Sequence, residues 1–273
     1  MANPANGIER IQQVFTGLKT GGRKALVIYL MAGDPNPEFT ARLVPRLAEA
    51  GADLVELGYP FSDPVADGPV IQAASQRALR QFSGLDDYLA LVGRIRQSTP
   101  VPLVLMTYYN LIFRYGEARF LQSARQAGLD GAILPDLPLE EAAPWRAQAL
   151  ELGVAPIFLE APNTTPVHAQ QIAQASAGFI YLVSLKGVTG SAAGLGENLQ
   201  DRIQRLRGHT QTPLLVGFGI STPSQARTYG AMSDGVIVGS ALVNLLAGDQ
   251  PEAQKEQAAV DLVKALRKGL DQG

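Results

Sequence analysis

Short apolar runs alternate with amphipathic segments along almost the whole chain. The runs are rich in Val, Ile and Leu and are continuous rather than alternating with polar residues, which is typical of strands covered on both faces of a parallel sheet. We predict eight strands, at Ala25–Met31, Asp53–Leu57, Leu103–Thr107, Gly131–Leu134, Ala155–Leu159, Phe179–Val183, Leu214–Val216 and Gly235–Val238.

Helical patterns lie between these runs, and several begin after Pro, Asp or Ser and end at Gly. The predicted helices are Glu38–Ala50, Leu85–Gln97, Glu117–Ala127, Glu140–Leu150, Val167–Ala175, Asn198–Leu206, Pro223–Tyr229 and Pro251–Leu270. Eight alternating strand and helix units fit a single closed (β/α)8 barrel, the TIM barrel of the α/β class. An open, doubly wound parallel sheet is the alternative with the same alternation.

Two further helical segments exceed the eight units. Ile8–Leu18 is amphipathic and could close the bottom of the barrel, and Pro69–Arg80 is a second helix pattern after the second strand. No Ser/Gly-rich linker or low-complexity tract marks a boundary. With 273 residues and 46% apolar content the chain can bury a large core, so one domain over residues 1–273 is the simpler interpretation.

The charge and composition narrow the classes of partner. The formal net charge is −2 and no basic run is present, which argues against nucleic acid and anionic membranes as partners. The chain has no cysteine, so no disulfide framework or thiolate metal site is expected. No apolar stretch approaches the roughly 18 residues that span a bilayer, and no secretory signal is recognised. We therefore expect a cytoplasmic protein that acts on small molecules or on another protein.

A carboxylate stands inside the second apolar run. Leu54, Glu56 and Gly58 share one face of this strand, so Glu56 projects into the barrel mouth if the branched neighbours pack on helices. Apolar surroundings disfavour the charged form of a carboxyl group and raise its pKa, which suits general acid and base chemistry near neutrality. The structural alternative is a Glu that pairs with a buried Arg or caps a loop.

A second carboxylate, Asp67, follows eleven residues later in a loop punctuated by proline and glycine. This loop must fold back over the end of the strand if Asp67 and Glu56 are to face one ligand. Asp-Gly pairs are common in turns and Asp often caps the following helix, so Asp67 alone is weak evidence. Asp63 is a further carboxylate in the same loop, and a structural role or a role in an interface is equally consistent with its position.

Glycine-containing turns follow the last three predicted strands, at Lys186–Ser191, Gly217–Ser221 and Val238–Ser240. Glycine lets backbone N–H groups approach an anion, and a helix that starts at Ser240 would direct its positive end to the same point. Barrels often bind phosphate at this position. No GxxxxGK[ST] sequence is present, so a nucleotide P-loop is not supported.

Other polar residues are poorer candidates. His168 and His209 have no second ligand at metal spacing, so no metal site is expected. Lys186 could form a Schiff base with a carbonyl substrate, although a lysine beside a phosphate is the alternative. Glu160 and Asp136 also end strands and could support the site indirectly.

Apolar residues near the expected site leave two questions open. Tyr181 on the sixth strand could line the pocket or fill the core. Leu111–Phe113 forms an apolar run after the third strand, where a polar loop is expected. It either folds inward or forms a partner-binding patch together with Pro60–Asp67 and Asp136–Pro138.

Several motifs follow one another over nearly the whole length of the chain. They are Glu56–Gly58, Pro60–Pro64, Ala66–Pro69, Leu134–Pro138, Gly187–Gly190, Gly217–Ser221 and Asp234–Ser240. In sequence and in order they resemble the α-subunit family of tryptophan synthase. The resemblance implies a (β/α)8 barrel that cleaves indole-3-glycerol phosphate to indole and glyceraldehyde 3-phosphate by a retro-aldol reaction, with neither cofactor nor metal. It also implies an α2β2 heterotetramer with the pyridoxal-phosphate β chain, to which the indole passes.

The same resemblance implies roles for individual residues. Glu56 would protonate indole C3 and handle the glycerol hydroxyl proton, and Asp67 would accept a hydrogen bond from the indole N–H. Thr189 would belong to a mobile loop that closes over Asp67. The other implied substrate contacts are Phe61, Tyr181 and Phe218 around the indole ring and Gly190, Gly219, Gly239 and Ser240 around the phosphate.

The chain departs from the family pattern in one region. The stretch Ser191–Gly196 lacks the Arg that many relatives carry soon after Gly190, and Lys186 replaces what is often a small residue. These changes bear on loop closure and on coupling to a partner rather than on the acid and base pair. The alternatives are a free-standing indole-glycerol-phosphate lyase, a Schiff-base aldolase that uses Lys186, and a non-catalytic binding or activating subunit.

Overall fold

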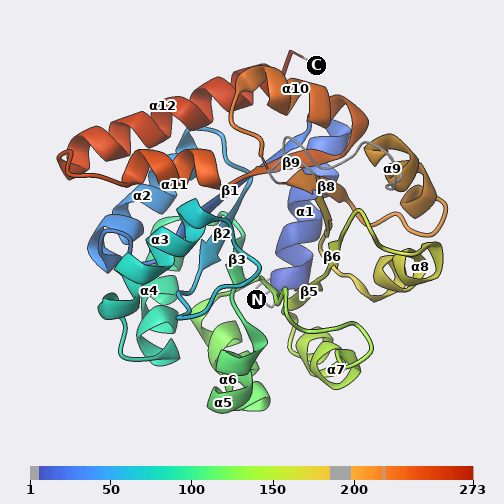
Figure 1. Cartoon of the computed structure of the whole chain (residues 1–273), viewed down its shortest axis with the longest axis horizontal. Helices are drawn as coiled ribbons and strands as arrows, with labels where there is room; N and C mark the ends of the chain where they lie inside the picture. The colour runs from blue at the N-terminus through green and yellow to red at the C-terminus, as the bar shows by residue number, and fades with distance from the viewer. Residues whose placement is uncertain (1–5, 185–197, 218, 273) are drawn as a thin grey trace, which may run out of the picture.

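The structure, a computed structural model, describes residues 6–184, 198–217 and 219–272. Its strands all pair in parallel in one sheet, in the order β5-β4-β3-β2-β1-β9-β8-β7-β6 (Figure 1). The strands are β1 Ala25–Met31, β2 Leu54–Gly58, β3 Leu103–Met106, β4 Gly131–Ile133, β5 Ala155–Ile157, β6 Leu159–Glu160, β7 Ile180–Val183, β8 Leu214–Gly217 and β9 Gly235–Val238.

The two strands at the ends of this order, β5 and β6, are parts of one segment, separated only by Phe158. β5 pairs with β4 and β6 pairs with β7, so the sheet closes on itself at the split fifth strand. The predicted (β/α)8 barrel with eight strand segments is therefore confirmed, and the open doubly wound sheet is wrong.

Most of the helices surround the sheet on its outer side, while α1 lies across the end of the barrel in the middle of the view (Figure 1). In the described residues they are α1 Gly7–Thr20, α2 Pro37–Glu49, α3 Pro69–Ala78, the 3-10 turn η1 Leu79–Gln81, α4 Leu85–Ser98, α5 Tyr109–Tyr115, α6 Glu117–Ala127, α7 Ala143–Glu151, α8 Pro166–Ala175, α9 Leu199–Arg207, α10 Pro223–Met232, α11 Ser240–Leu246 and α12 Glu252–Leu270. Side-chain caps fix several starts. The Asn36 side chain accepts from Phe39 N at 2.8 Å before α2, for example.

One helix prediction and one loop prediction need correction. The helix expected from Glu140 begins at Ala143, because Glu141 N and Ala142 N bond to the carbonyls of Pro138 and Leu139 in turns. The apolar run at residues 111–113, expected in a loop, lies in the short helix α5.

The predicted N-terminal helix does close the bottom of the barrel. The Arg10 guanidinium pairs with the buried Asp130 carboxylate at 2.5 Å, and Ile8 N donates to Gly153 O at 3.1 Å. The apolar side chains of α1 that enter the interior cluster are Ile11, Phe15 and Leu18. Among the described helices, none combines the length and the apolar character that crossing a bilayer requires.

Two apolar layers determine which way β2 presents its side chains. Val55 and Leu57 belong to the core between the sheet and the outer helices. Leu54 belongs to the cluster inside the barrel. Because side chains alternate along a strand, Glu56 and Gly58 also face the interior, as the sequence predicted.

Candidate active site

Glu56 lies inside the barrel, in register with Tyr29 on β1 and Val104 on β3. It is 1% exposed, and its Oε1 has no hydrogen-bond partner in the described part of the chain. Burial raises the pKa of Glu56 from 4.5 to about 8. The structural alternatives, a buried Arg partner or a loop cap, are not seen among the described residues. A carboxyl group in this setting holds its proton at neutral pH and can donate it to a bound molecule.

Asp67 lies in the loop between β2 and α3. The Tyr108 hydroxyl donates to Asp67 Oδ2 at 3.1 Å and accepts from Ala66 N at 2.9 Å. Burial raises the pKa of Asp67, and the hydrogen bond from Tyr108 opposes this rise. The capping alternative fails, because Gly68 is the N-cap of α3 and no side chain caps this helix.

The two carboxylates lie near the same two tyrosines, Tyr29 and Tyr181. Burial raises the pKa of Tyr29 well above its ordinary value, and the charges of Asp67 and Glu56 raise it further. Burial also raises the pKa of Tyr181, and the charges of Glu56 and Asp67 raise it further, that of Glu56 by more. Since electrostatic effects of this kind fall off with distance, both acids lie near the same two phenol rings. The loop therefore folds back over β2, as the pairing of the two acids required.

Tyr181 is 8% exposed and lies inside the barrel, where it fills the core and also faces the carboxylates. Two strand-end glycines make room for the phenols at the mouth. A Cβ on Gly58 would collide with the Tyr29 hydroxyl, and a Cβ on Gly217 would collide with the Tyr181 hydroxyl. Glycine at positions 58 and 217 thus lets the two hydroxyls approach the backbone more closely than any residue with a Cβ would permit there.

Sequence reasoning missed two of these aromatic residues. Tyr29 could have been found from its inward position in β1, but only with the register that places it opposite Glu56. Tyr108 follows β3 at the mouth, and its ring stacks on Phe61 with centroids 4.8 Å apart. The half-buried Phe61 ring thus lies against the residue that holds Asp67.

The remaining predicted contacts fall into two groups. Gly219 follows β8 with φ of +76°, and Gly239 is the N-cap of α11, which begins at Ser240 after β9. These three residues lie at the carboxyl ends of neighbouring strands, on the same end of the barrel as Glu56. The others lie outside the described residues, and they are Thr189, Gly190, Phe218 and the Schiff-base candidate Lys186.

The other carboxylates have structural partners. Glu160 is buried against α9, where Arg202 Nε donates to its Oε2 at 2.9 Å. Asp136 accepts from Tyr109 N at 2.7 Å at the start of α5. The exposed Asp63 accepts from the neighbouring Ser62 hydroxyl.

The histidines lie at the surface, where His168 approaches Glu140 at 3.4 Å. Within the described ranges, no group of three His, Cys, Asp or Glu side chains is arranged to hold a metal ion.

Helix α3 fastens the loop that carries Asp67. The buried Ser75 hydroxyl accepts from Phe61 N at 2.9 Å and donates to Phe61 O at 2.8 Å. Gln72 Nε2 donates to Asp67 O at 2.9 Å. The helix is itself held by Arg77, which pairs with the buried Asp34 at 2.7 Å. Main-chain contacts thus set the position of Asp67 at both ends of the loop.

Known proteins match this chain in sequence and in fold over nearly its full length. The family model for the tryptophan synthase alpha chain matches residues 15–272. The tryptophan synthase alpha chain of Geobacter sp. strain M21 is 46% identical over 266 residues, which cover 97% of this chain and 99% of the relative. That of Thermoanaerobacter sp. strain X514 is 41% identical, with 96% and 100% covered.

A solved structure matches this chain in fold and in sequence. The alpha subunit of tryptophan synthase from Legionella pneumophila strain Paris superposes with a TM-score of 0.86 at 38% identity, covering 97% of this chain and 99% of the other. The match includes both the barrel and the segments that carry Glu56 and Asp67. The chain belongs to the tryptophan synthase alpha chain family.

Proposed function

We propose that this chain cleaves indole-3-glycerol phosphate to indole and glyceraldehyde 3-phosphate. The observation that carries the proposal is Glu56, a buried carboxyl group without a partner at Oε1, which lies with Asp67 near Tyr29 and Tyr181 and whose pKa burial raises to about 8. Family membership supports the same reaction. The reaction requires a proton donor at an aromatic carbon and uses neither cofactor nor metal.

The proposed cleavage is an internal transfer of a proton and an electron pair. Glu56 donates its proton to indole C3, which turns the ring into an electron-accepting iminium ion. The glycerol hydroxyl next to C3 then loses its proton to the Glu56 carboxylate, the C–C bond breaks, and its electron pair restores the indole ring. The hydroxyl carbon becomes the aldehyde of glyceraldehyde 3-phosphate, and Glu56 ends protonated as it began.

Asp67 is proposed to stabilise the intermediate cation. Positive charge develops at the indole nitrogen when C3 is protonated, and an ionised carboxylate that accepts from the N–H lowers the energy of that state. The hydrogen bond from Tyr108 favours the ionised form of Asp67. The proposal requires Asp67 to be ionised while Glu56 is protonated; burial raises the pKa of both carboxyl groups, and the hydrogen bond from Tyr108 opposes this rise at Asp67.

Substrate contacts follow the two ends of the molecule. Phe61 and Tyr181 are proposed to flank the indole ring, and Gly219, Gly239 and Ser240 are proposed to bind the phosphate at the carboxyl ends of β8 and β9. Thr189, Gly190 and Phe218 are assigned to the same substrate on the resemblance alone.

An assay of the isolated chain tests the reaction and separates the alternatives. We expect indole to be released from indole-3-glycerol phosphate without any added partner, and no substrate adduct to be trapped by borohydride. A borohydride-stable adduct on Lys186 would identify a Schiff-base aldolase instead. Absence of indole under all conditions would favour a non-catalytic binding subunit.

Ser75 offers a test of how the Asp67 loop is positioned. Ser75→Ala removes both hydrogen bonds between the Ser75 side chain and the Phe61 main chain. The partly buried N–H of Phe61 is then left unpaired, which costs about 1–3 kcal/mol of unfolding free energy. We expect kcat for indole formation to fall about tenfold, because catalysis is sensitive to displacement of a positioned group. Thermal unfolding and steady-state kinetics measure both effects. The exposed Ser224→Ala is the control, and a Ser75→Ala variant with unchanged kcat would contradict the positioning role.

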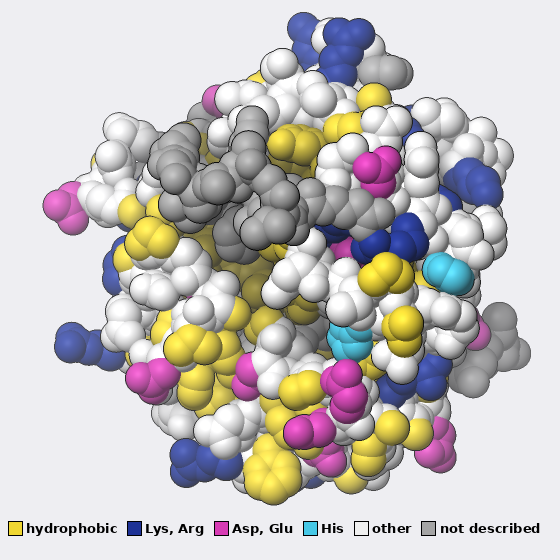
Figure 2. All heavy atoms as spheres, turned by 45° about the vertical axis from the view of Figure 1, so that its right-hand side comes forward, with side chains coloured by type: hydrophobic (Ala, Val, Ile, Leu, Met, Phe, Trp, Pro, Cys, Tyr) yellow, Lys and Arg dark blue, Asp and Glu magenta, His cyan; other side chains and the backbone are white. Residues whose placement is uncertain are grey.

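A β chain is the proposed partner, in an α2β2 assembly that receives the indole. Support comes from the family and from exposed apolar side chains near the mouth, since Val65 in the Asp67 loop is 84% exposed and Phe113 on α5 is 64% exposed. Figure 2 also shows apolar side chains around a hollow in the middle of one face. Exposed apolar patches of this kind are typical of protein interfaces. A free-standing lyase is the alternative.

Charge placed on α5 tests this docking surface. We expect Phe113→Asp to weaken binding to a cognate β chain at least about tenfold, because exposed aromatic residues often dominate interface energies. Indole formation by the isolated variant should remain normal. Val167→Asp is the matched control, since Val167 is 68% exposed on α8. Wild-type chain that fails to capture the β chain would favour the free-standing enzyme, and equal capture by both variants would place the interface elsewhere.

A further inference from the structure

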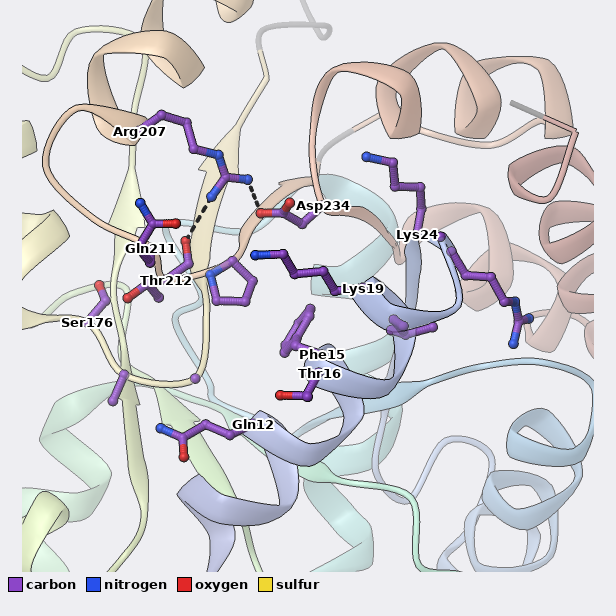
Figure 3. A pocket seen from close by; sticks show the side chains of 16 residues that line it. Gln12, Phe15, Thr16, Lys19, Lys24, Ser176, Arg207, Gln211, Thr212 and Asp234 are labelled. Carbon is purple, nitrogen blue, oxygen red and sulfur yellow. Dashed lines mark hydrogen bonds and ion pairs between the residues drawn. The ribbon is translucent and has the colours of Figure 1, made fainter.

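A cavity opens at the end of the barrel opposite Glu56. It has a volume of about 880 Å³ and lies between α1 and the turns that precede β7 and β8 (Figure 3). Its walls are residues 176–178 and 211–213 on one side and, on the other, five residues of α1, namely Gln12, Phe15, Thr16, Leu18 and Lys19. The polar contacts of α1 described above, through Arg10 and Ile8, run to Asp130 before β4 and to Gly153 before β5, not to the turns before β7 and β8. We call this cavity the basal hollow.

The basal hollow is positively charged although the chain as a whole is negative. The formal net charge of the chain is −2. The charged side chains that line the basal hollow are Lys19, Arg23, Lys24, Arg207 and the single carboxylate Asp234. This local excess of cations favours an anionic ligand.

Most of these cations already have partners. Arg23 pairs with Asp271 at 3.3 Å, and Lys24 Nζ donates to Ser233 O at 2.6 Å. Arg207 pairs with Asp234, whose Oδ2 also accepts from Leu214 N, so that carboxylate is locally neutralised. These charges contribute to the field in the basal hollow but are not free to bind.

Lys19 is the exception. Its ammonium group has no hydrogen bond or ion pair within the described segments, and Figure 3 shows the side chain extending from α1 into the basal hollow, toward Asp234 and Arg207. Gln12, Thr16 and Gln211 surround the opening, and their side chains likewise form no described hydrogen bond. One unpaired cation with neutral donors around it suits a single negative charge better than a doubly charged anion.

Apolar surface accompanies this cation. Phe15 and Pro213 line the basal hollow, and the Phe15 ring also packs on Phe179 with centroids 6.3 Å apart, which fixes its orientation. The part of Phe15 that reaches the basal hollow, together with Pro213, gives it an apolar wall that a flat apolar group can contact. Cavities of about 300–1,000 Å³ with apolar walls and a few convergent polar groups commonly bind small organic molecules.

We propose that the basal hollow binds an aromatic carboxylate. The ligand's carboxylate pairs with the Lys19 ammonium, next to the outer edge of the Arg207 guanidinium, and its ring lies against Phe15 and Pro213. This site is separate from the reaction proposed at Glu56, and a ligand here bridges α1 to the turns before β7 and β8. Such a ligand stabilises the folded chain by mass action.

Calorimetric titration of the full chain with benzoate tests the proposal. We expect one benzoate per chain, with an affinity that falls as salt is added because the cation is exposed. Lys19→Gln should weaken binding about tenfold, the usual effect of losing a charge-assisted hydrogen bond. Lys19→Arg should largely restore it. Lys264→Gln, an exposed lysine on α12, is the matched control and should bind normally.

Two comparison probes define what is recognised. Benzyl alcohol keeps the ring without the charge, and inorganic phosphate keeps the charge without the ring, so both should bind more weakly than benzoate. The proposal is overturned if benzoate does not bind, if it binds Lys19→Gln as tightly as wild type, or if phosphate binds equally well. It is also overturned if indole displaces benzoate, because the ligand would then occupy the proposed substrate site at Glu56. Unchanged indole formation by Lys19→Gln would verify that the variant is folded.

Discussion

Glu56→Gln is expected to lower indole formation by about 10³-fold, within the range for loss of a general acid and base. Glutamine keeps the size and burial of the side chain but can neither donate nor recover a proton at C3. Glu56 has no described partner at Oε1 that the substitution would break, so the fold should persist. Steady-state indole release measures the effect. The exposed Glu49→Gln is the control, and near wild-type turnover of Glu56→Gln would refute the role of Glu56.

The same variant should change how stability depends on pH. The pKa of Glu56 is raised from 4.5 to about 8 in the folded chain by burial. Between these values the folded state binds more protons than the unfolded state, so this group's contribution to stability is complete below pH 4.5 and is lost as pH rises through about 8. Glu56→Gln removes this loss. The free energy of unfolding of Glu56→Gln minus that of wild type should therefore be larger above pH 8 than at pH 5. Unfolding of both proteins at the two pH values measures this change.

Asp67→Asn has the second largest expected effect, a loss of about 10²–10³ in kcat, comparable to removal of an electrostatic contact to a transition state. Asparagine keeps the hydrogen bond with Tyr108 but removes the negative charge that is proposed to face the indole N–H. The melting temperature should change little, because Asp67 does not cap α3.

Asp63→Asn is the matched control for Asp67→Asn. It removes one negative charge from the same loop at an exposed position, so it reports any general effect of loop charge. We expect its turnover to be close to wild type. If the two variants were equally impaired, the effect would come from the charge of the loop as a whole and the specific role of Asp67 would be lost.

The sequence predicted the barrel because each strand is covered on both faces and therefore stands out as an apolar run. Strand ends were less predictable. β3 stops at Met106, one residue before the predicted end, and the fifth strand divides at Phe158. These ends depend on which residues of the neighbouring strands offer hydrogen-bond partners. The sequence of one strand does not identify those partners.

The candidate site was predictable where one residue conflicts with its local pattern, and hidden where residues meet through the fold. Glu56 is conspicuous as a carboxylate in an apolar strand. Tyr29 is an ordinary strand residue until β1 pairs with β2, and Tyr108 until it meets the Asp67 loop. The apolar run that includes Phe113 was ambiguous because α5 is short and only one side of it is buried.

Titration of the Glu56 carboxyl carbon by ¹³C NMR, with the signal assigned from its absence in Glu56→Gln, tests most directly whether this side chain holds a proton at neutral pH. The structure predicts a midpoint near pH 8, raised by burial. A midpoint near 4.5, the ordinary value for a glutamate, would show that Glu56 is ionised at neutral pH and cannot be the proton donor.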